Sequence, residues 1–236
     1  STLFPYTTLF RSCYIDKKTV LIDFIKSKID HFYRSKDIRN RYYIKSINEN
    51  LETIIKILRI LENNSPNIIL LGKETKTKRA LLHFASYIAN IDFLEIDSSY
   101  NNELLKNKEV FIESEIKPFL KKTGLMNRKS ILYIPPNIKT QYVFDTIHSL
   151  MDKKEIPNNF IFIEQNPDNE ITEEEIIEAL ENNICICIDV NYGTEEYINL
   201  FTKYSNIVKN SSVIYLHKWN DEDMKAYYNI SIKEIE

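Results

Sequence analysis

The sequence predicts an α/β fold in which helices cover a five-stranded parallel sheet. Short apolar runs recur along the 236 residues, each long enough for one buried strand. Segments with apolar residues at helical spacing separate these runs. There is no internal repeat and no low-complexity linker, so the strands are expected to join one sheet, connected by crossover helices.

The expected strands are apolar runs that end at a turn or at a residue that interrupts pairing. The first ends at Gly72, and the third ends at Pro135 and Pro136, which cannot donate a ladder hydrogen bond. The fourth alternates isoleucine and cysteine before a turn at 191–193. The five core strands are expected at 67–71, 93–97, 130–134, 184–188 and 212–216, with an additional strand at 160–164.

The expected helices each have an apolar face, and several have recognisable ends. The helix before the third strand is expected to end at Thr123, with Gly124 as its left-handed cap. Thr172 and Glu175 form a capping-box pattern that opens a later helix. The remaining helices are expected at 17–34, 51–61, 80–89, 142–151 and 197–204, and after Asn220.

Composition excludes several classes of function. A net charge of −3 argues against binding to nucleic acid or a membrane surface through bulk charge. No apolar run approaches the roughly 18 residues of a membrane span. Cys185 and Cys187 share one strand and are expected to pack in the core rather than bind metal. The four histidines lack metal-ligand spacing, so no metal is expected.

The first twelve residues differ in origin from the rest. Read back into codons, 2–12 can be written as a common short-read sequencing adapter in frame. We therefore expect 1–12 to be an artefact without a domain, and the chain to be a fragment.

The turn after the first strand carries a partial phosphate-binding motif. Residues 72–79 read G-K-E-T-K-T-K-R, against the P-loop pattern G-x-x-x-x-G-K-[ST]. Gly72 and Lys78 are kept, whereas Thr77 replaces the second glycine and Arg79 replaces the hydroxyl residue. Without further glycines the backbone N–H groups cannot all turn onto phosphate oxygens. Weak phosphate binding and a solvated basic turn are both consistent with this loop.

Magnesium chemistry lacks its usual ligands. A metal-holding acid is expected at the end of the third strand, where the chain has Pro135 and Pro136. With no acid there and no hydroxyl at Arg79, the sequence predicts no efficient ATP hydrolysis and no bound metal. Replacement of Lys78 by alanine is accordingly expected to alter neither stability nor turnover appreciably.

The order of these features resembles the fourth AAA+ module of dynein heavy chains. The resemblance lies in the helix at 50–61, the loop and helix at 70–85, the stretch at 138–158 and the tail at 182–219. It implies an AAA+ P-loop core at 67–218. The flanking segments would be N-terminal helices at 13–66 and the start of a truncated helical lid at 219–236.

The resemblance also implies a role. The parent would be an ATP-driven microtubule motor of the cytoplasm and cytoskeleton, or of an axoneme or cilium. This module would bind ATP or ADP weakly, with Asn191 near the family's sensor position, and would contact neighbouring AAA+ modules. The microtubule and the dynein intermediate and light chains would bind elsewhere on the parent. The alternatives are another AAA+ protein, an independent P-loop NTPase, or an inert α/β scaffold.

Overall fold

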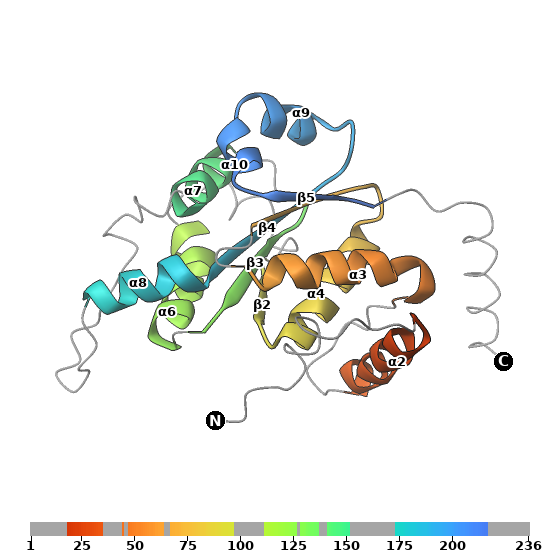
Figure 1. Ribbon diagram of the computed structural model, residues 1–236. Coiled ribbons are helices and arrows are strands. Elements are labelled where there is room, and N and C mark those ends of the chain that lie inside the picture. Colours follow the sequence, from red (N-terminus) through yellow and green to blue (C-terminus); the bar gives the residue numbers. More distant parts are fainter. Residues whose placement is uncertain are drawn as a thin grey trace.

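Helices lie on both faces of a central sheet in this protein (Figure 1). The computed structural model describes residues 18–34, 44, 47–63, 67–96, 111–126, 128–136, 141–151 and 173–216. Within these ranges no helix is long and apolar enough to cross a membrane. Residues 1–12, Thr172 and Asn220 lie outside the described ranges, as does the additional strand expected at 160–164.

Among the described residues, five parallel strands form the sheet in the order β2-β3-β4-β1-β5, which confirms the predicted fold class. Pairing of Leu71 with Val190, and of Ile134 with Ile188, brings the carboxyl ends of β1, β3 and β4 to one edge. The strands are β1 (Ile68–Leu71), β2 (Asp92–Glu95), β3 (Ser130–Ile134), β4 (Ile184–Val190) and β5 (Ser212–Tyr215).

Residues of the central strands are buried on both faces, as their nearly continuous apolar sequences predict. Every residue of β1, β3 and β4 is buried. One of them is charged, namely Asp189 in the otherwise apolar β4.

On one face of the sheet, helices α3 and α4 pack apolar side chains that include Ile54 and Phe84 into one core with Ile68 and Tyr133. Helix α2 packs on the outside of α3 and α4, where Phe32 contacts Phe84. These helices are α2 (Lys18–Arg34), α3 (Ile47–Leu61) and α4 (Thr75–Ala89).

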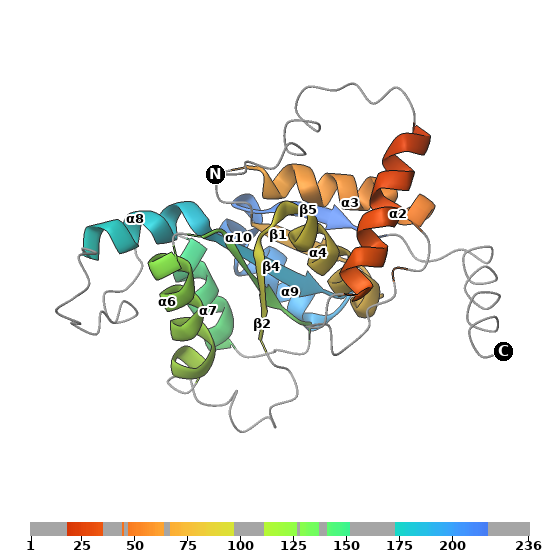
Figure 2. The same cartoon turned by 90° about the horizontal axis from the view of Figure 1, so that it is seen from below.

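The opposite face is covered by helices from the second half of the chain (Figures 1 and 2). A π-helical turn at Ile112–Ile116 leads into the first of them. Phe119, Ile147, Leu180 and Leu200 are buried there against the sheet. The helices are α6 (Lys117–Met126), α7 (Gln141–Met151), α8 (Glu173–Asn183), α9 (Glu195–Thr202) and α10 (Ser205–Lys209).

Two helix ends differ from the sequence prediction. Helix α6 runs through Gly124 to Met126, so the prediction of a left-handed cap at Gly124 is wrong. Gly124 is buried, and tertiary packing of the helix outweighs the cost of about 1 kcal/mol for an internal glycine. The single helix expected at 197–204 is instead two helices, α9 and α10, separated by Lys203 and Tyr204.

A buried asparagine links three strands at the amino end of β1. The side chain of Asn67 accepts a hydrogen bond from the backbone N–H of Ile186, at 3.1 Å, and donates one to the carbonyl of Asn210, at 3.3 Å. Its backbone carbonyl accepts the N–H of Ser212 at 2.8 Å. Asn67 therefore fixes where β4 and β5 begin to pair with β1.

Candidate functional site

The loop after β1 is short because helix α4 begins early. Only Gly72, Lys73 and Glu74 separate β1 from α4, which starts at Thr75. The backbone N–H of Lys78 already donates to the carbonyl of Glu74, at 3.0 Å, in the helical pattern. Residues that would form the loop in the P-loop pattern are thus part of the first helical turn.

Gly72 is needed for the chain to leave β1 at this angle. Its φ is +152°, which favours glycine, and an added Cβ atom would lie 2.9 Å from the carbonyl oxygen of Leu216. The first glycine of the motif therefore has a steric role at the end of the sheet.

Lys78 points into the protein and has no exposed surface. Its Nζ atom donates to the carbonyl oxygen of Gly72 at 2.5 Å and to that of Val190 at 3.2 Å. It also donates to Oδ1 of Asn191 at 3.2 Å and forms an ion pair with Oδ1 of Asp189. The lysine ammonium is therefore surrounded by oxygen atoms of the protein itself.

Asp189 completes a buried polar group with Lys78 and Tyr133. The Tyr133 hydroxyl donates to Oδ2 of Asp189 at 2.5 Å, from the adjacent strand β3. Burial raises the pKa of Asp189 to about 6, although the nearby Lys78 ammonium and the Tyr133 hydrogen bond both oppose this rise. Burial, followed by the charge of Asp189, raises the pKa of Tyr133 far above its ordinary value. The Asp189 carboxyl is therefore ionised at neutral pH, with tyrosine as a neutral donor.

The carboxylate at this edge lies on β4 rather than on β3. Pro135 and Pro136 directly follow β3, the first buried and the second half-buried. Since Ile134 pairs with Ile188, Pro135 lies at the level of Asp189 in the neighbouring strand.

The structure brings together some of the predicted site residues and not others. Gly72, Lys78 and Asn191 meet, and Oδ1 of Asn191 is also 3.5 Å from the Thr75 hydroxyl. Thr77 is half-buried in the first turn of α4. Arg79 is directed away from this group and forms an ion pair with Glu95 of β2.

Sequence reasoning missed Asp189 and Tyr133. The available signal was a lone acidic residue inside an apolar strand, because a buried charge requires a partner. The burial of Lys78 also disagrees with the expectation that its replacement by alanine leaves stability unchanged, since the substitution would leave the Asp189 carboxylate buried without a cation.

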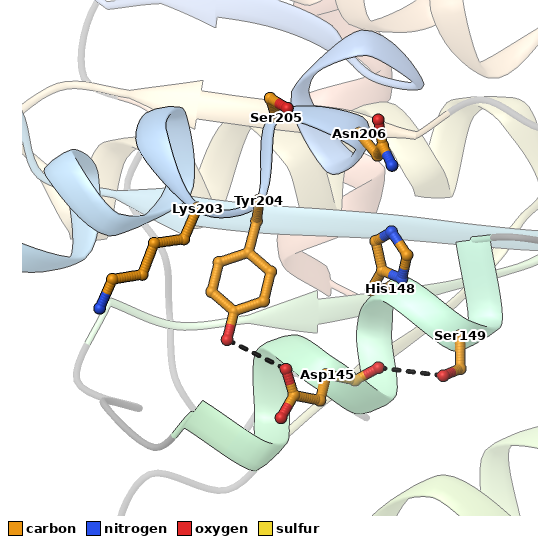
Figure 3. Close-up of a pocket in the computed structure, with 7 residues that line it drawn as sticks. All are labelled: Asp145, His148, Ser149, Lys203, Tyr204, Ser205 and Asn206. Carbon is orange, nitrogen blue, oxygen red and sulfur yellow. Dashed lines mark hydrogen bonds between the residues drawn. The ribbon is translucent and has the colours of Figure 1, made fainter.

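A pocket lies on the other face of the sheet, between α7 and the α9–α10 connection (Figure 3). The Tyr204 hydroxyl donates to Oδ1 of Asp145 at 3.0 Å and closes one side of it. Partial burial, with the hydrogen bond and charge of Asp145, raises the pKa of Tyr204 to about 12. This pocket of about 340 Å³ is lined by Asp145, His148, Ser149, Lys203, Tyr204, Ser205 and Asn206. Among the described residues no group of histidine, cysteine and acidic side chains could hold a metal ion.

The sheet order, with the Gly72–Glu74 turn that leads from β1 into α4 and its Lys78, defines an α/β P-loop module of the AAA+ type. Residues 45–236 match the family described as P-loop containing dynein motor region D4. The match covers most of the chain, which belongs to this family of dynein motor modules. No curated protein matches the sequence.

Proposed function

We propose that this module acts as a structural and allosteric part of a dynein motor and does not hydrolyse ATP efficiently itself. The observation that carries the proposal is the buried ion pair between Lys78 and Asp189. In a hydrolytic site this lysine contacts phosphate groups, whereas here the protein supplies its own anion. Such a module would transmit shape changes that other modules generate.

The residues at the site do not fit a magnesium–ATP complex. Magnesium is held by carboxylate or hydroxyl oxygens beside the phosphates. The end of β3 offers Pro135 in place of an acid, and both oxygens of Asp189 already contact Lys78 and Tyr133. Arg79, at the motif's hydroxyl position, pairs with Glu95. We therefore expect no bound metal, and ATP or ADP binding that is weak at most.

Titration with a fluorescent ATP analogue, with and without magnesium, tests this proposal, together with phosphate release from ATP. We expect weak binding that magnesium does not strengthen, and no turnover above the enzyme-free blank. The Arg79→Thr variant, which restores the motif's hydroxyl, is a matched control and should not create turnover, because no acid follows β3. Tight magnesium-dependent binding or measurable turnover by the unaltered chain would contradict the proposal.

The proposed partners are neighbouring AAA+ modules of the same motor. Support comes from exposed apolar side chains beside the edge strand β5, where the rings of Tyr192 and Tyr215 lie 6.5 Å apart. Val213, also on β5, is exposed too, so this surface is suited to contact with another protein. In this proposal other parts of the motor bind the microtubule and the intermediate and light chains, in the cytoplasm, the cytoskeleton or a cilium.

A substitution at the exposed surface tests the partner proposal. Val213→Thr together with Tyr215→Ser should leave the melting temperature of the isolated module within about 2 °C of the unaltered chain, because both residues are about half exposed at the edge of the sheet. In the motor, the same changes should increase proteolysis between this module and its neighbour. Unchanged proteolysis would argue against contact through this surface.

A further inference from the structure

We propose that Asp189 is an internal competitor for oxyanions: it holds the Lys78 ammonium in the core and thereby keeps the β1–α4 loop from binding phosphate groups. The inference rests on the proposed function in one respect, that the loop of the unaltered chain binds nucleotide weakly or not at all. The inference names the cause of that weak binding, the Asp189 carboxylate, which a single substitution removes.

The first support is that the N–H donors of the Lys78 ammonium all have acceptors within the protein. An ammonium group has three N–H donors. From the part of the chain that the structure describes, four oxygen atoms surround it, namely those of the Asp189 carboxylate, the Gly72 and Val190 carbonyls and the Asn191 amide. All three donors therefore have acceptors within the protein, and the acceptor that carries a full negative charge is the Asp189 carboxylate.

The second support is the charge balance of the buried group. Of these four oxygen atoms, only that of Asp189 carries a formal charge. If Asp189 becomes neutral, a fully buried ammonium is left with dipoles alone, and its desolvation is no longer offset by an opposite charge. The free energy of this state falls when an external anion reaches the ammonium.

The third support is the direction from which an anion can approach. Gly72 and Asn191 contact the ammonium from the loop side, where Lys73 and Glu74 are exposed and Asn191 is half-buried. The same loop leads into the first turn of α4, whose N–H groups give it a positive end. Tyr133 approaches Asp189 from β3, on the far side of the carboxylate from Lys78.

The Asp189→Asn variant tests the proposal. Asparagine preserves shape, and its side-chain oxygen can still accept the Tyr133 hydrogen bond, but the negative charge is lost. Inorganic tripolyphosphate is the probe, because it presents phosphate oxygens without a base or sugar. Binding is measured by calorimetry and by the shift in melting temperature at increasing probe concentration.

We expect tripolyphosphate to bind Asp189→Asn about tenfold or more tightly than the unaltered chain, the gain typical of one charge-assisted hydrogen bond. The gain should vanish in the double variant Lys78→Met with Asp189→Asn, which has the same lost carboxylate and no ammonium. If the single variant is partly unfolded, the probe should restore its folded signal, because a ligand of the folded state shifts the equilibrium toward it.

Equal binding by the single variant and the unaltered chain would overturn the inference, as would an equal gain in the double variant or a failure of the probe to restore folding. The proposed function has a separate failure, which is magnesium-dependent ATP turnover by the unaltered chain. A negative result with Asp189→Asn leaves that proposal intact, so the two can be told apart.

Discussion

The Nζ atom of Lys78 and the Oδ1 atom of Asp189 form an ion pair in which both side chains have 0% exposed surface. The lysine lies in the first turn of α4, and the aspartate is the penultimate residue of β4. The pair therefore connects the start of a helix to the carboxyl edge of the sheet. Because each charge has lost its hydration, the stability of either one depends on the other.

Removal of one partner should therefore be far more costly than removal of both. Lys78→Met leaves a buried carboxylate without a cation and should lower the free energy of unfolding by about 3–5 kcal/mol. The combined replacement Lys78→Met with Asp189→Leu should recover much of this loss, since apolar side chains of similar volume fill the site. Urea denaturation of the single and double variants measures the coupling.

Comparison of Lys78→Met with Lys56→Met distinguishes the buried pair from a surface ion pair. Lys56→Met removes an exposed i,i+4 pair with Glu52 and should change the free energy of unfolding by less than about 1 kcal/mol. A loss for Lys78→Met as small as that for Lys56→Met would show that the buried pair contributes little coupling.

Gly72 and Gly193 provide a matched pair of backbone tests. Both have positive φ, +152° and +78°, but an added Cβ atom at Gly72 meets the Leu216 carbonyl at 2.9 Å, whereas at Gly193 nothing lies within 4 Å. Gly193→Ala should thus lower the free energy of unfolding by about 1 kcal/mol, the cost of holding a residue with a Cβ atom at positive φ. Gly72→Ala adds a clash with backbone and should cost about 2–4 kcal/mol.

Thermal or urea unfolding of both alanine variants gives the comparison. Equal losses of unfolding free energy for the two variants would show that the close contact of Gly72 with the Leu216 carbonyl does not affect stability. Glycine would then be required at this position for its φ alone.

The sheet was predictable because each core strand is a separate apolar run, and burial on both faces of a parallel sheet requires that composition. The end of α6 was not predictable from the sequence. Glycine is a common helix cap, and the packing that buries Gly124 within the helix depends on residues distant in sequence. The Lys78–Asp189 pair was missed for a related reason. The motif placed Lys78 in a degenerate phosphate-binding loop, but its partner is 111 residues away and becomes adjacent only through the pairing of β1 with β4.

Asn67 should be one of the most sensitive polar positions outside the loop. Asn67→Leu keeps the volume but leaves the N–H of Ile186 and the carbonyl of Asn210 without their side-chain partner. A buried group without a hydrogen bond costs about 1–3 kcal/mol, so a loss in this range or somewhat above it is expected. Ser149→Ala, which removes one exposed side-chain hydrogen bond on α7, is the control and should cost less than about 1 kcal/mol.

Hydrogen exchange adds a local measurement for Asn67→Leu. The amides of Ile186 and Ser212 should lose protection more than those at the centre of β3, because the asparagine organises only the amino end of β1. A uniform loss of protection across the sheet would show that Asn67 acts on global stability alone.

His83 should make the module sensitive to acid. Its ring stacks on Phe93, with centroids 4.4 Å apart, and meets the edge of Phe32 at 5.1 Å. Burial, followed by the positive charge of Arg79, lowers the pKa of His83 from 6.5 to about 4. In the folded protein the imidazole therefore resists protonation.

Between pH 6.5 and about 4 the unfolded chain binds a proton at this histidine and the folded protein does not. Unfolding is then coupled to proton uptake, so the contribution of His83 is fully present above pH 6.5 and is lost as the pH falls toward 4. Since the ring keeps some contact with solvent, we expect the free energy of unfolding to fall by about 1–2 kcal/mol, less than the full pKa shift would give.

His83→Phe retains an aromatic ring between Phe32 and Phe93 without a titrating group. Urea denaturation at pH 7.5 and pH 4.5 should show a smaller drop in the free energy of unfolding for His83→Phe than for the unaltered chain. Equal drops would mean that His83 takes up its proton in the folded protein as readily as in the unfolded chain.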